Sequence, residues 1–275
     1  MEVSTGVHAV HIADTAVSHP GGSNIYFIGD PSQEMIILDT GEHDQDWTKQ
    51  ILDAYRELGS PTITAIAITH GHGDHIGGLD RVFEVVNAPV RCHPKLVKRL
   101  AAVIGEQNVI KLKANERLRT GGNVILRSIF TPGHEEDHVC YYLAREKIMF
   151  TGDTILGASS STVRDLSSYM KSLEKLSTFR VEIICPAHGP IVPKPRGSRL
   201  INWYINHRNQ RESEVLAALQ KGIIDVDDMV KDIYPRNLKK GLRRAAAGNV
   251  RTHLSKLVKE KVVEEVPATY QLKSD

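Results

Sequence analysis

The chain has 275 residues, is 41% hydrophobic and 25% charged, and carries a formal net charge of +2. This composition is typical of a soluble globular protein, and the length allows one large domain with a small appendage. No run approaches the roughly 20 apolar residues that span a membrane, and residues 1–20 lack the Lys and Arg of a signal peptide or presequence. We therefore expect a cytoplasmic protein without membrane contact. Its three cysteines, without C-x-x-C spacing, are expected to be free buried thiols: Cys92, Cys140 and Cys185.

Charge is distributed unevenly along the chain. Residues 1–195 hold 19 basic and 23 acidic residues, a net of −4, whereas residues 196–275 hold 16 basic and 10 acidic residues, a net of +6. Four prolines between Pro186 and Gly197 separate these parts. We predict a large domain over 1–195 and a small C-terminal domain over 196–275, whose basic character permits a polyanionic partner.

Strands and helices alternate through the first domain. Val7–Ile12 alternates as an edge strand does, and Asp46–Leu58 has helical spacing that stops at Gly59-Ser60-Pro61. Further strands are predicted over residues 25–28, 35–39, 63–68, 90–92, 124–130, 139–143, 147–150 and 181–185. Further helices are predicted over residues 76–83, 94–104 and 165–176. This alternation predicts an α/β fold.

The C-terminal part has a different pattern. A long helix over 198–219, capped by Ser198, precedes three shorter helices over 225–233, 239–247 and 249–259. Residues 262–266 and 269–272, split by Pro267, indicate a hairpin, and helices followed by a hairpin predict a winged-helix-like α+β domain. The last helix of such a fold can enter a nucleic-acid groove, and its basic residues would face that groove: Arg251, His253, Lys256 and Lys259. The alternative is a module for packing or for dimerisation, and in the latter case the protein would be a homodimer.

Side chains that bind metals follow several predicted strands. The strand over 63–68 runs into His70-Gly71-His72-Gly73-Asp74-His75, and three other strands are followed by His134, Asp153 and His188. Neutral imidazole and carboxylate suit a borderline ion such as zinc, and these seven side chains are enough for two ions. Asp39 follows a buried strand and could orient a ligand histidine from behind or bond its own turn.

These motifs resemble the metallo-β-lactamase superfamily, and over nearly the whole chain its β-lactamase-like protein 2 branch. The resemblance also rests on Leu38-Asp39-Thr40-Gly41, on residues 151–157 and on residues 204–212. It implies an αββα sandwich with a dinuclear site at one sheet edge. It further implies that His70, His72 and His134 hold the first ion. Asp74, His75 and His188 would hold the second ion, and Asp153 would bridge both.

Some features separate the chain from particular relatives. Asp153 argues against β-lactamase activity, because antibiotic-hydrolysing members lack the bridging aspartate. Only 34 residues separate Asp153 from His188, too few for the inserted domain of one group of RNA-processing nucleases. Gly71 stands where relatives often carry a bulky aromatic residue, and we expect it to open the floor of the site.

The resemblance implies two Zn²⁺ ions per chain, with Mn²⁺ or Fe²⁺ as alternatives. Two such ions can share a hydroxide by lowering the pKa of water from 15.7 to about 7. Asp74 and Asp153 are the candidate catalytic residues, because they could orient this nucleophile and then shuttle its proton. Ser159-Ser160-Ser161 lies just beyond Asp153 and could contact substrate or form a plain polar loop.

The sequence leaves three interpretations of the function open. The first is an endoribonuclease that cuts single-stranded RNA and grips its phosphates with Arg251, Lys256 and Lys259. The second is a thioester hydrolase acting on acyl-carrier or glutathione thioesters. The third is a non-enzymatic winged-helix protein that binds nucleic acid, which the intact set of seven ligands argues against.

Overall fold

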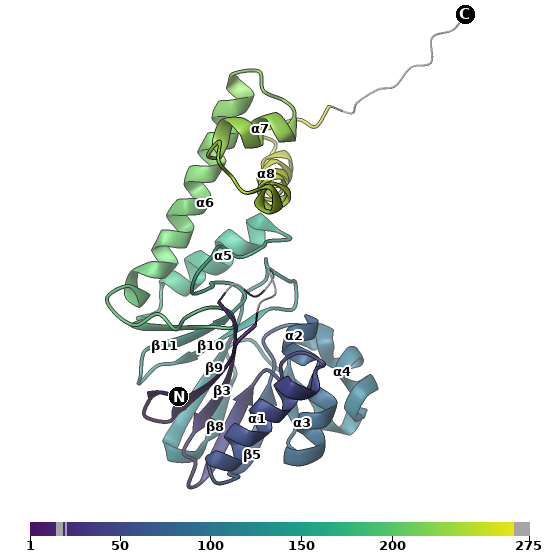
Figure 1. Ribbon diagram of the computed structural model, residues 1–275, viewed down its shortest axis with the longest axis vertical. Coiled ribbons are helices and arrows are strands. Elements are labelled where there is room, and N and C mark those ends of the chain that lie inside the picture. The colour runs from purple at the N-terminus through teal and green to yellow at the C-terminus, as the bar shows by residue number, and fades with distance from the viewer. Residues whose placement is uncertain (15–18, 20, 267–275) are drawn as a thin grey trace, which may run out of the picture.

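Two β-sheets lie face to face in the part of the molecule below the C-terminal helices in Figure 1. The structure is a computed structural model and describes residues 1–14, 19 and 21–266. The first sheet has the order β1 (Glu2–Ser4), β2 (Val7–Ile12), β3 (Ser23–Gly29), β4 (Glu34–Leu38), β5 (Thr62–Ala67), β6 (Val90–Cys92), β7 (Val109–Lys111). The second sheet has the order β12 (Ile183–Pro186), β11 (Ile148–Gly152), β10 (Val139–Leu143), β9 (Val124–Phe130), β8 (Arg117–Thr120).

Helices cover the outer face of each sheet. The first sheet is covered by α1 (Gln45–Glu57), α2 (Gly73–Ile76), α3 (Leu79–Val86) and α4 (Val97–Ile104). The second sheet is covered by α5 (Leu166–Ser177) and the first turns of α6 (Gly197–Gln220). Three short 3₁₀ turns connect elements: η1 (Pro94–Leu96), η2 (Glu106–Asn108) and η3 (Gly121–Asn123). These layers confirm the predicted αββα sandwich.

The strand β4 illustrates how the sequence builds these layers. Its side chains alternate between two apolar cores, since successive residues of a strand point to opposite faces. Ile36 and Leu38 pack between the two sheets, and Met35 and Ile37 pack against the covering helices. A strand buried on both faces has an unbroken apolar sequence, which is why it could be recognised from the sequence.

Several predicted elements of the first domain need correction. The strand over Val7–Ile12 is not at the edge, because β1 pairs with its outer side. The helix predicted over 76–83 is two helices: α2 ends at Ile76 and α3 begins at Leu79. A Cβ atom on the intervening Gly77 would lie 2.3 Å from the backbone nitrogen of His43. Glycine therefore lets the loop after β4 pack closely here. The short strands β1, β7 and β8 were not predicted.

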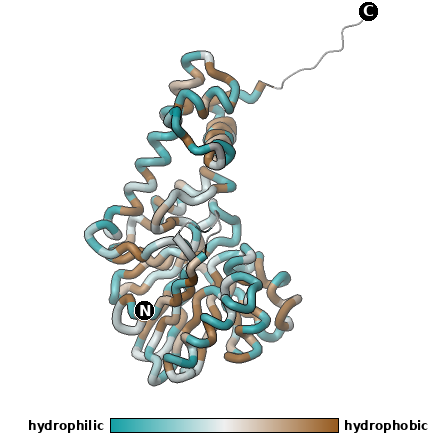
Figure 2. Tube along the Cα trace, in the orientation of Figure 1, coloured by the Kyte–Doolittle hydropathy of each residue, from teal (hydrophilic) through white to brown (hydrophobic). Residues whose placement is uncertain are grey.

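The C-terminal helices form a module of their own. α7 (Val226–Ile233) and α8 (Lys240–Lys259) pack on the second half of α6 around Val215, Met229 and Val250. In Figure 2 the middle of α6 is hydrophilic and its apolar residues lie toward the two ends, which pack on the sandwich and on the other C-terminal helices. The first half of α6 contributes Leu200 and Tyr204 to the core over the second sheet. The division of the chain at residues 195 and 196 therefore falls just before a helix shared by both parts.

Three predictions about this module were wrong. The two helices expected over 239–247 and 249–259 are the single helix α8. Ser198 does not cap α6, because the helix begins at Gly197 with Arg196 at the cap position. Within the described residues, 262–266 form no strand; residues 269–272 lie outside the part that the structure describes. No helix of the described chain is long and apolar enough to cross a membrane.

Candidate metal centre

The candidate ligands meet where several strands end at one edge of the sandwich. β4 and β5 run parallel, and so do β11 and β12. β9 runs in the direction of β11 because both are antiparallel to β10. The loops that follow these strands therefore open at one edge, and they carry Asp39, His70, His134, Asp153 and His188.

Two glycines let these loops turn tightly. A Cβ atom on Gly133, next to His134, would lie 2.4 Å from the Cα atom of Tyr169. Gly152, next to Asp153, has φ +47° and leaves room for the His138 ring, whose Nε2 would be 2.6 Å from a Cβ atom there. Both positions require glycine on steric grounds, and both place a ligand side chain at the edge.

Four of the predicted ligands form a first cluster. One ligand atom from each lies within 4.8 Å of the others: His70, His72, His134 and Asp153. The Nε2 atom of His134 is 3.3 Å from Nδ1 of His72 and 3.6 Å from Oδ2 of Asp153.

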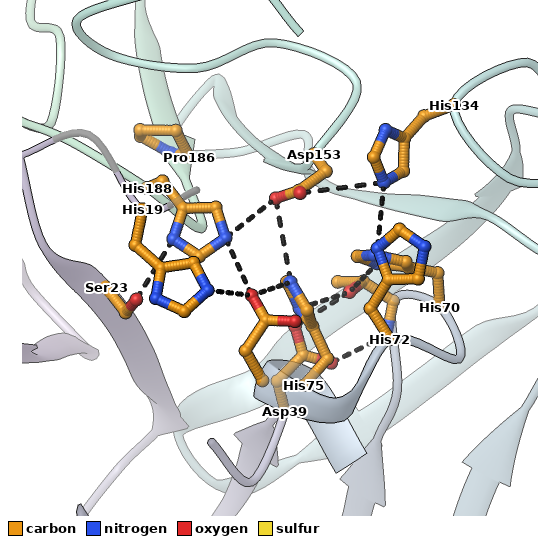
Figure 3. A network of polar contacts seen from close by, with 12 residues as sticks. His19, Ser23, Asp39, His70, His72, His75, His134, Asp153, Pro186 and His188 are labelled. Atoms are coloured by element: carbon orange, nitrogen blue, oxygen red, sulfur yellow. Dashed lines mark hydrogen bonds and ion pairs between the residues drawn. The ribbon is translucent and has the colours of Figure 1, made fainter. Parts of the chain in front are cut away.

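A second cluster shares Asp153. Its Oδ1 atom lies 3.3 Å from Nε2 of His188 and 3.6 Å from Nε2 of His75. Oδ2 of Asp74 lies 3.1 Å and 3.4 Å from the same two nitrogens. The two carboxylate oxygens of Asp153 thus face the two clusters separately, as Figure 3 shows. All seven residues predicted as ligands are brought together.

The ligand atoms lack the partners that buried polar atoms normally have. Nε2 of His70, His75 and His188 and Oδ1 of Asp153 are buried without a hydrogen-bond partner among the described residues. An unsatisfied buried polar atom costs about 1–3 kcal/mol, so four such atoms directed into the two clusters indicate a binding site for cations. Divalent metal ions fit this donor set of imidazoles and carboxylates.

Hydrogen bonds from behind hold the histidine rings. Oδ2 of Asp39 accepts from Nδ1 of His75 at 2.8 Å, and the Asp39 carboxylate also accepts from the backbone N–H and hydroxyl of Thr69. The orienting role predicted for Asp39 is thus confirmed as a contact. Its backbone has φ +64°, a left-handed conformation that Asp tolerates better than most residues. Such outer bonds fix the tautomer and raise the basicity of a ligand.

Other orienting partners were not predicted. The hydroxyl of Ser23 lies 3.0 Å from Nδ1 of His188, and the carbonyl of Thr162 lies 2.8 Å from Nδ1 of His134. Oε1 of Glu135 lies 2.6 Å from Nε2 of His72. Ser23 and His188 are 165 positions apart. No local spacing signals such a pair, although the adjacency of Glu135 to His134 was visible in the sequence.

Burial and neighbouring charges determine the protonation states of the histidine and aspartate side chains in both clusters. Burial lowers the pKa of His70 and of His134, so both rings are neutral at pH 7 and offer a lone pair. Burial also acts to lower the pKa of His75, but the Asp39 and Asp74 carboxylates raise it above its ordinary value. Burial opposes the Asp74 carboxylate, yet its contacts with His188 and His75 lower its pKa. Metal binding here would therefore displace a proton from His75.

Two further expectations about the site have clear outcomes. A Cβ atom on Gly71 would lie 2.7 Å from Leu96 and 2.9 Å from Asp137, so the site floor is filled there and not open. The three cysteines are free and buried, as predicted. Burial raises the pKa of each thiol, to about 12 for Cys92 and about 11 for Cys140. None is therefore a thiolate nucleophile at pH 7.

Half of the predicted nucleic-acid surface on α8 is turned inward, because Arg251 and Lys259 are exposed whereas His253 and Lys256 are not. His253 is 1% exposed, and the amino group of Lys256 bonds Glu212 and Glu260 at 2.7 Å and 2.8 Å. The amino group of Lys259 is 3.2 Å from the Asp165 carboxylate, between the module and the sandwich. Arg251 alone of the three predicted contacts is exposed and has no ion pair among the described residues. The expectation that this face of α8 is free for a groove is therefore wrong for His253 and Lys256.

The loop after β11 that contains Ser159, Ser160 and Ser161 contacts the metal centre through one residue. Ser161 is buried, and its hydroxyl lies 3.3 Å from Nδ1 of His134. The side chains of Tyr204 and Arg208 on α6 hold this loop through the carbonyls of Ser159 and Ser161. The segment 204–212, noted in the sequence, thus supports a ligand histidine from outside the sandwich.

Comparisons with known proteins agree with this geometry. Residues 19–188 match the model of the metallo-beta-lactamase superfamily, and residues 226–269 match that of the beta-lactamase associated winged helix domain. A crystal structure of a metallo-beta-lactamase family protein from Thermus thermophilus is similar with a TM-score of 0.73 and 21% identity, covering 96% of each chain. At that identity the likeness concerns the fold.

Curated relatives are more similar in sequence. The beta-lactamase-like protein 2 homolog of Drosophila melanogaster is 35% identical over 87% of this chain and 83% of its own length. The atrochrysone carboxyl ACP thioesterase of Passalora fulva is 34% identical over 79% of this chain and 64% of its own length. The homolog of beta-lactamase-like protein 2 from Caenorhabditis elegans is 32% identical over 88% of this chain and 81% of its own length. With these matches spanning the sheet edge and its ligands, the chain belongs to the metallo-beta-lactamase superfamily, in the branch of the beta-lactamase-like protein 2 homologues, and carries that family's winged-helix domain.

Proposed function

We propose that this chain is a dinuclear metal-dependent hydrolase, with zinc as the first candidate and Mn²⁺ or Fe²⁺ as alternatives. The observation that carries the proposal is the position of Asp153, whose two carboxylate oxygens face different histidine clusters. His70, His72 and His134 would hold one ion; Asp74, His75 and His188 would hold the other. Two bound ions would polarise the scissile group and generate a nucleophile at neutral pH.

The chain's own residues would position the reacting groups. Asp74 has a lowered pKa and stays ionised at pH 7, so it can accept a hydrogen bond from an incoming water and orient it. The Asp153 carboxylate faces the same space and is the second candidate for accepting a proton from that water. Asp39, Ser23 and the Thr162 carbonyl keep the rings aimed, which limits reorganisation during the reaction.

For the substrate we propose single-stranded RNA, bound beside the centre on α6. A cavity of about 640 Å³ is lined by the loop 156–160 and by α6 residues that include Arg199, Trp203 and His207, with Arg196 just before the helix. Trp203 is 52% exposed and its ring stacks on His207, with centroids 5.1 Å apart and planes at 9°. An exposed stacked ring beside two guanidinium groups suits a base and its phosphates.

The loop 156–160 connects this cavity to the metal ligands. The backbone N–H of Gly157, which lines the cavity, donates to the carbonyl of His188 at 3.0 Å. Ser161, at the other end of the loop, contacts His134. An RNA strand with a base stacked on Trp203 would therefore be separated from the metal ligands by the loop 156–160. This placement replaces α8 by α6 as the proposed phosphate-binding element.

A thioester hydrolase is the second candidate. It is favoured by the relative from Passalora fulva, whose name states a thioesterase acting on an acyl carrier protein. The same cavity has an apolar side formed by Leu156, Leu200 and Trp203, which would suit an acyl chain. The two candidates differ in the bond that is cut, so direct turnover separates them.

The test compares three substrates with metal-loaded protein: a fluorescent single-stranded RNA, bis-p-nitrophenyl phosphate and an acyl thioester. We expect cleavage of the RNA and of the small diester. Trp203→Ala should weaken RNA binding by about 1–3 kcal/mol, the value of one stacked base. Arg196→Gln with Arg199→Gln should reduce the slope of log affinity against log salt by about 0.7 for each lost phosphate contact.

Arg251→Gln is the matched control, because it removes one exposed charge from the module without touching the cavity. Its RNA affinity should stay close to that of the wild type. The small diester reports whether the metal centre is intact in each variant. Rapid turnover of the thioester without RNA cleavage would replace the proposal by the second candidate.

A further inference from the structure

His19 lies at the second cluster although it belongs to none of the ligand motifs. Its Nε2 atom is 3.1 Å from Oδ2 of Asp74, the same distance as Nε2 of His188 from that oxygen. The rings of His19 and His188 are stacked, with centroids 4.8 Å apart and planes at 7° (Figure 3). The His19 side chain is 12% exposed. Two parallel imidazoles thus direct the same nitrogen at one carboxylate oxygen.

These separations are those of atoms that share an ion. Two atoms each about 2.1 Å from one metal ion lie about 3–3.4 Å from each other. The two distances from Oδ2 of Asp74, to Nε2 of His19 and to Nε2 of His188, fit this spacing at 3.1 Å each. One ligand atom from each of the three residues lies within 4.8 Å of the others. The cluster therefore has room for a ligand that the motifs do not predict.

The second ring nitrogen of His19 has the partner that a ligand histidine needs. Nδ1 of His19 is hydrogen-bonded to the Asp14 carboxylate. His75 is held in the same way by Asp39, with its Nδ1 on a carboxylate and its Nε2 toward the cluster. A carboxylate behind an imidazole is a recurrent arrangement at metal sites, where it fixes the tautomer and raises ligand basicity.

His138 also lies near the site, but its ring nitrogens have different partners from those of His19. Its ring is buried near His70, but neither nitrogen is available. Nδ1 lies 2.9 Å from the hydroxyl of Thr131, and Nε2 accepts from the backbone N–H of Asp153 at 3.1 Å. His138 therefore supports the loop of Asp153, whereas His19 keeps one nitrogen directed at the cluster.

We propose that His19 is an additional ligand of the second ion and that Asp14 orients it. The inference rests on the proposed dinuclear centre and adds a side chain to the seven ligands predicted from the sequence. His19 would join Asp74 and His188, whose ligand atoms form one group with its own, and His188 also belongs to the adjoining group with His75 and Asp153. Zinc sites usually have four ligands, so a further imidazole favours an ion that accepts a larger coordination number, such as Mn²⁺ or Fe²⁺.

Cobalt binding to the metal-free protein tests this assignment without relying on activity. Co²⁺ is titrated into the wild type, His19→Ala and Asp14→Asn, and the visible absorption bands and bound metal are measured. We expect two ions in the wild type. Asp14→Asn should lower the affinity for the second ion about 10- to 100-fold, because loss of a hydrogen-bond partner of a metal ligand has an effect of this size. His19→Ala should weaken it more and change the visible bands, with the first ion unaffected.

His19→Cys gives a direct signature. If position 19 is in the coordination sphere, this variant should show the intense near-ultraviolet charge-transfer absorption of a thiolate bound to Co²⁺. The native thiols are buried and do not belong to the cluster, so they contribute no such band. His43→Ala, which changes an exposed histidine outside the clusters, is the control and should match the wild type.

The outcomes separate this inference from the proposed function. Two tight ions in the wild type, with unchanged affinities and spectrum in His19→Ala and no charge-transfer band in His19→Cys, would overturn the role of His19 and leave the dinuclear centre standing. A single ion in the wild type would instead contradict the dinuclear proposal itself. Circular dichroism of each variant checks that a loss of metal does not reflect a loss of fold.

Discussion

Asp153 is the residue that distinguishes a two-ion centre from two separate clusters. Its carboxylate faces both histidine sets, while its backbone N–H is bonded to His138 independently of the side chain. The loop conformation should therefore survive loss of the carboxylate. The side chain is needed for the ions and not for the turn that carries it.

Asp153→Ala should consequently keep its fold and lose metal-dependent turnover. We expect bound metal to fall from about two ions per chain, and kcat/KM to fall about 1,000-fold or more, since several kcal/mol of stabilisation are lost and each 1.4 kcal/mol is tenfold. Elemental analysis and turnover of bis-p-nitrophenyl phosphate measure both effects. Asp53→Ala, on the exposed side of α1, is the control. Near-normal turnover in Asp153→Ala would remove the bridged mechanism.

At the scale of elements, α8 is the clearest case of tertiary packing overriding a local signal. Gly248 predicts a break between two helices, since glycine costs about 1 kcal/mol relative to alanine in a helix. The helix continues because Ala246, Ala247, Val250 and Leu257 bury one face against α6 and α7. The site at Gly248 itself is open. Packing of the residues before and after Gly248 stabilises the helix by more than the glycine destabilises it.

The α6–α8 contact also makes the module sensitive to acid. His253 is buried, and burial, together with Arg208, Arg211 and Lys256, lowers its pKa from 6.5 to about 3. At pH 7 its contact with Glu212 is therefore a hydrogen bond of a neutral ring. The unfolded chain takes up a proton near pH 6.5 that the folded module accepts only near pH 3. Stability from this group is thus lost as the pH falls from about 6.5 toward 3.

Urea unfolding at several pH values tests this linkage. The unfolding free energy of the wild type should fall by up to about 1.4 kcal/mol per pH unit from this group between about pH 6.5 and 3. His253→Gln, which cannot titrate, should show a smaller decline over that range, and the exposed His43→Gln should behave as the wild type. An identical pH dependence in His253→Gln would show that His253 is not the sensitive group.

At the scale of the molecule, the metal centre joins the two sheets. His70 follows β5 of the first sheet, whereas His134, Asp153 and His188 follow strands of the second. Protein contacts at the same edge are specific: Nδ2 of Asn24 on β3 donates to the carbonyl of Pro186 on β12. Ions bound between these loops would therefore act as cross-links between the halves of the sandwich.

Removing the metal should lower the thermal stability of the protein. An ion present at 100 times its Kd stabilises the folded state by about 2.7 kcal/mol, which corresponds to roughly 5–10 °C in Tm for each ion in a domain of this size. Calorimetry before and after chelation measures the change, with elemental analysis confirming that the ions have left. Asp153→Ala should respond less to the chelator. An unchanged Tm after complete metal removal would contradict the cross-linking role.

The sequence by itself determined the seven candidate ligands and the strand ends that carry them, because these depend on short-range information, whereas the αββα sandwich was implied by the resemblance to the superfamily. A buried strand followed by a tight turn and a histidine is visible within a few residues, as at His134 and His188. Asp39 could be placed near the ligands for the same reason, but only its contact with His75 decided between orienting a histidine and bonding its own turn.

Only the tertiary structure decided which distant side chains complete the centre and which faces remain free. Ser23 meets His188 across the two sheets, and His19 reaches Asp74 from a separate loop. Lys256 is paired with Glu212, although the sequence of its helix predicts a basic surface. These contacts arise from how the layers pack, and side-chain spacing along the chain carries no record of which elements will become neighbours.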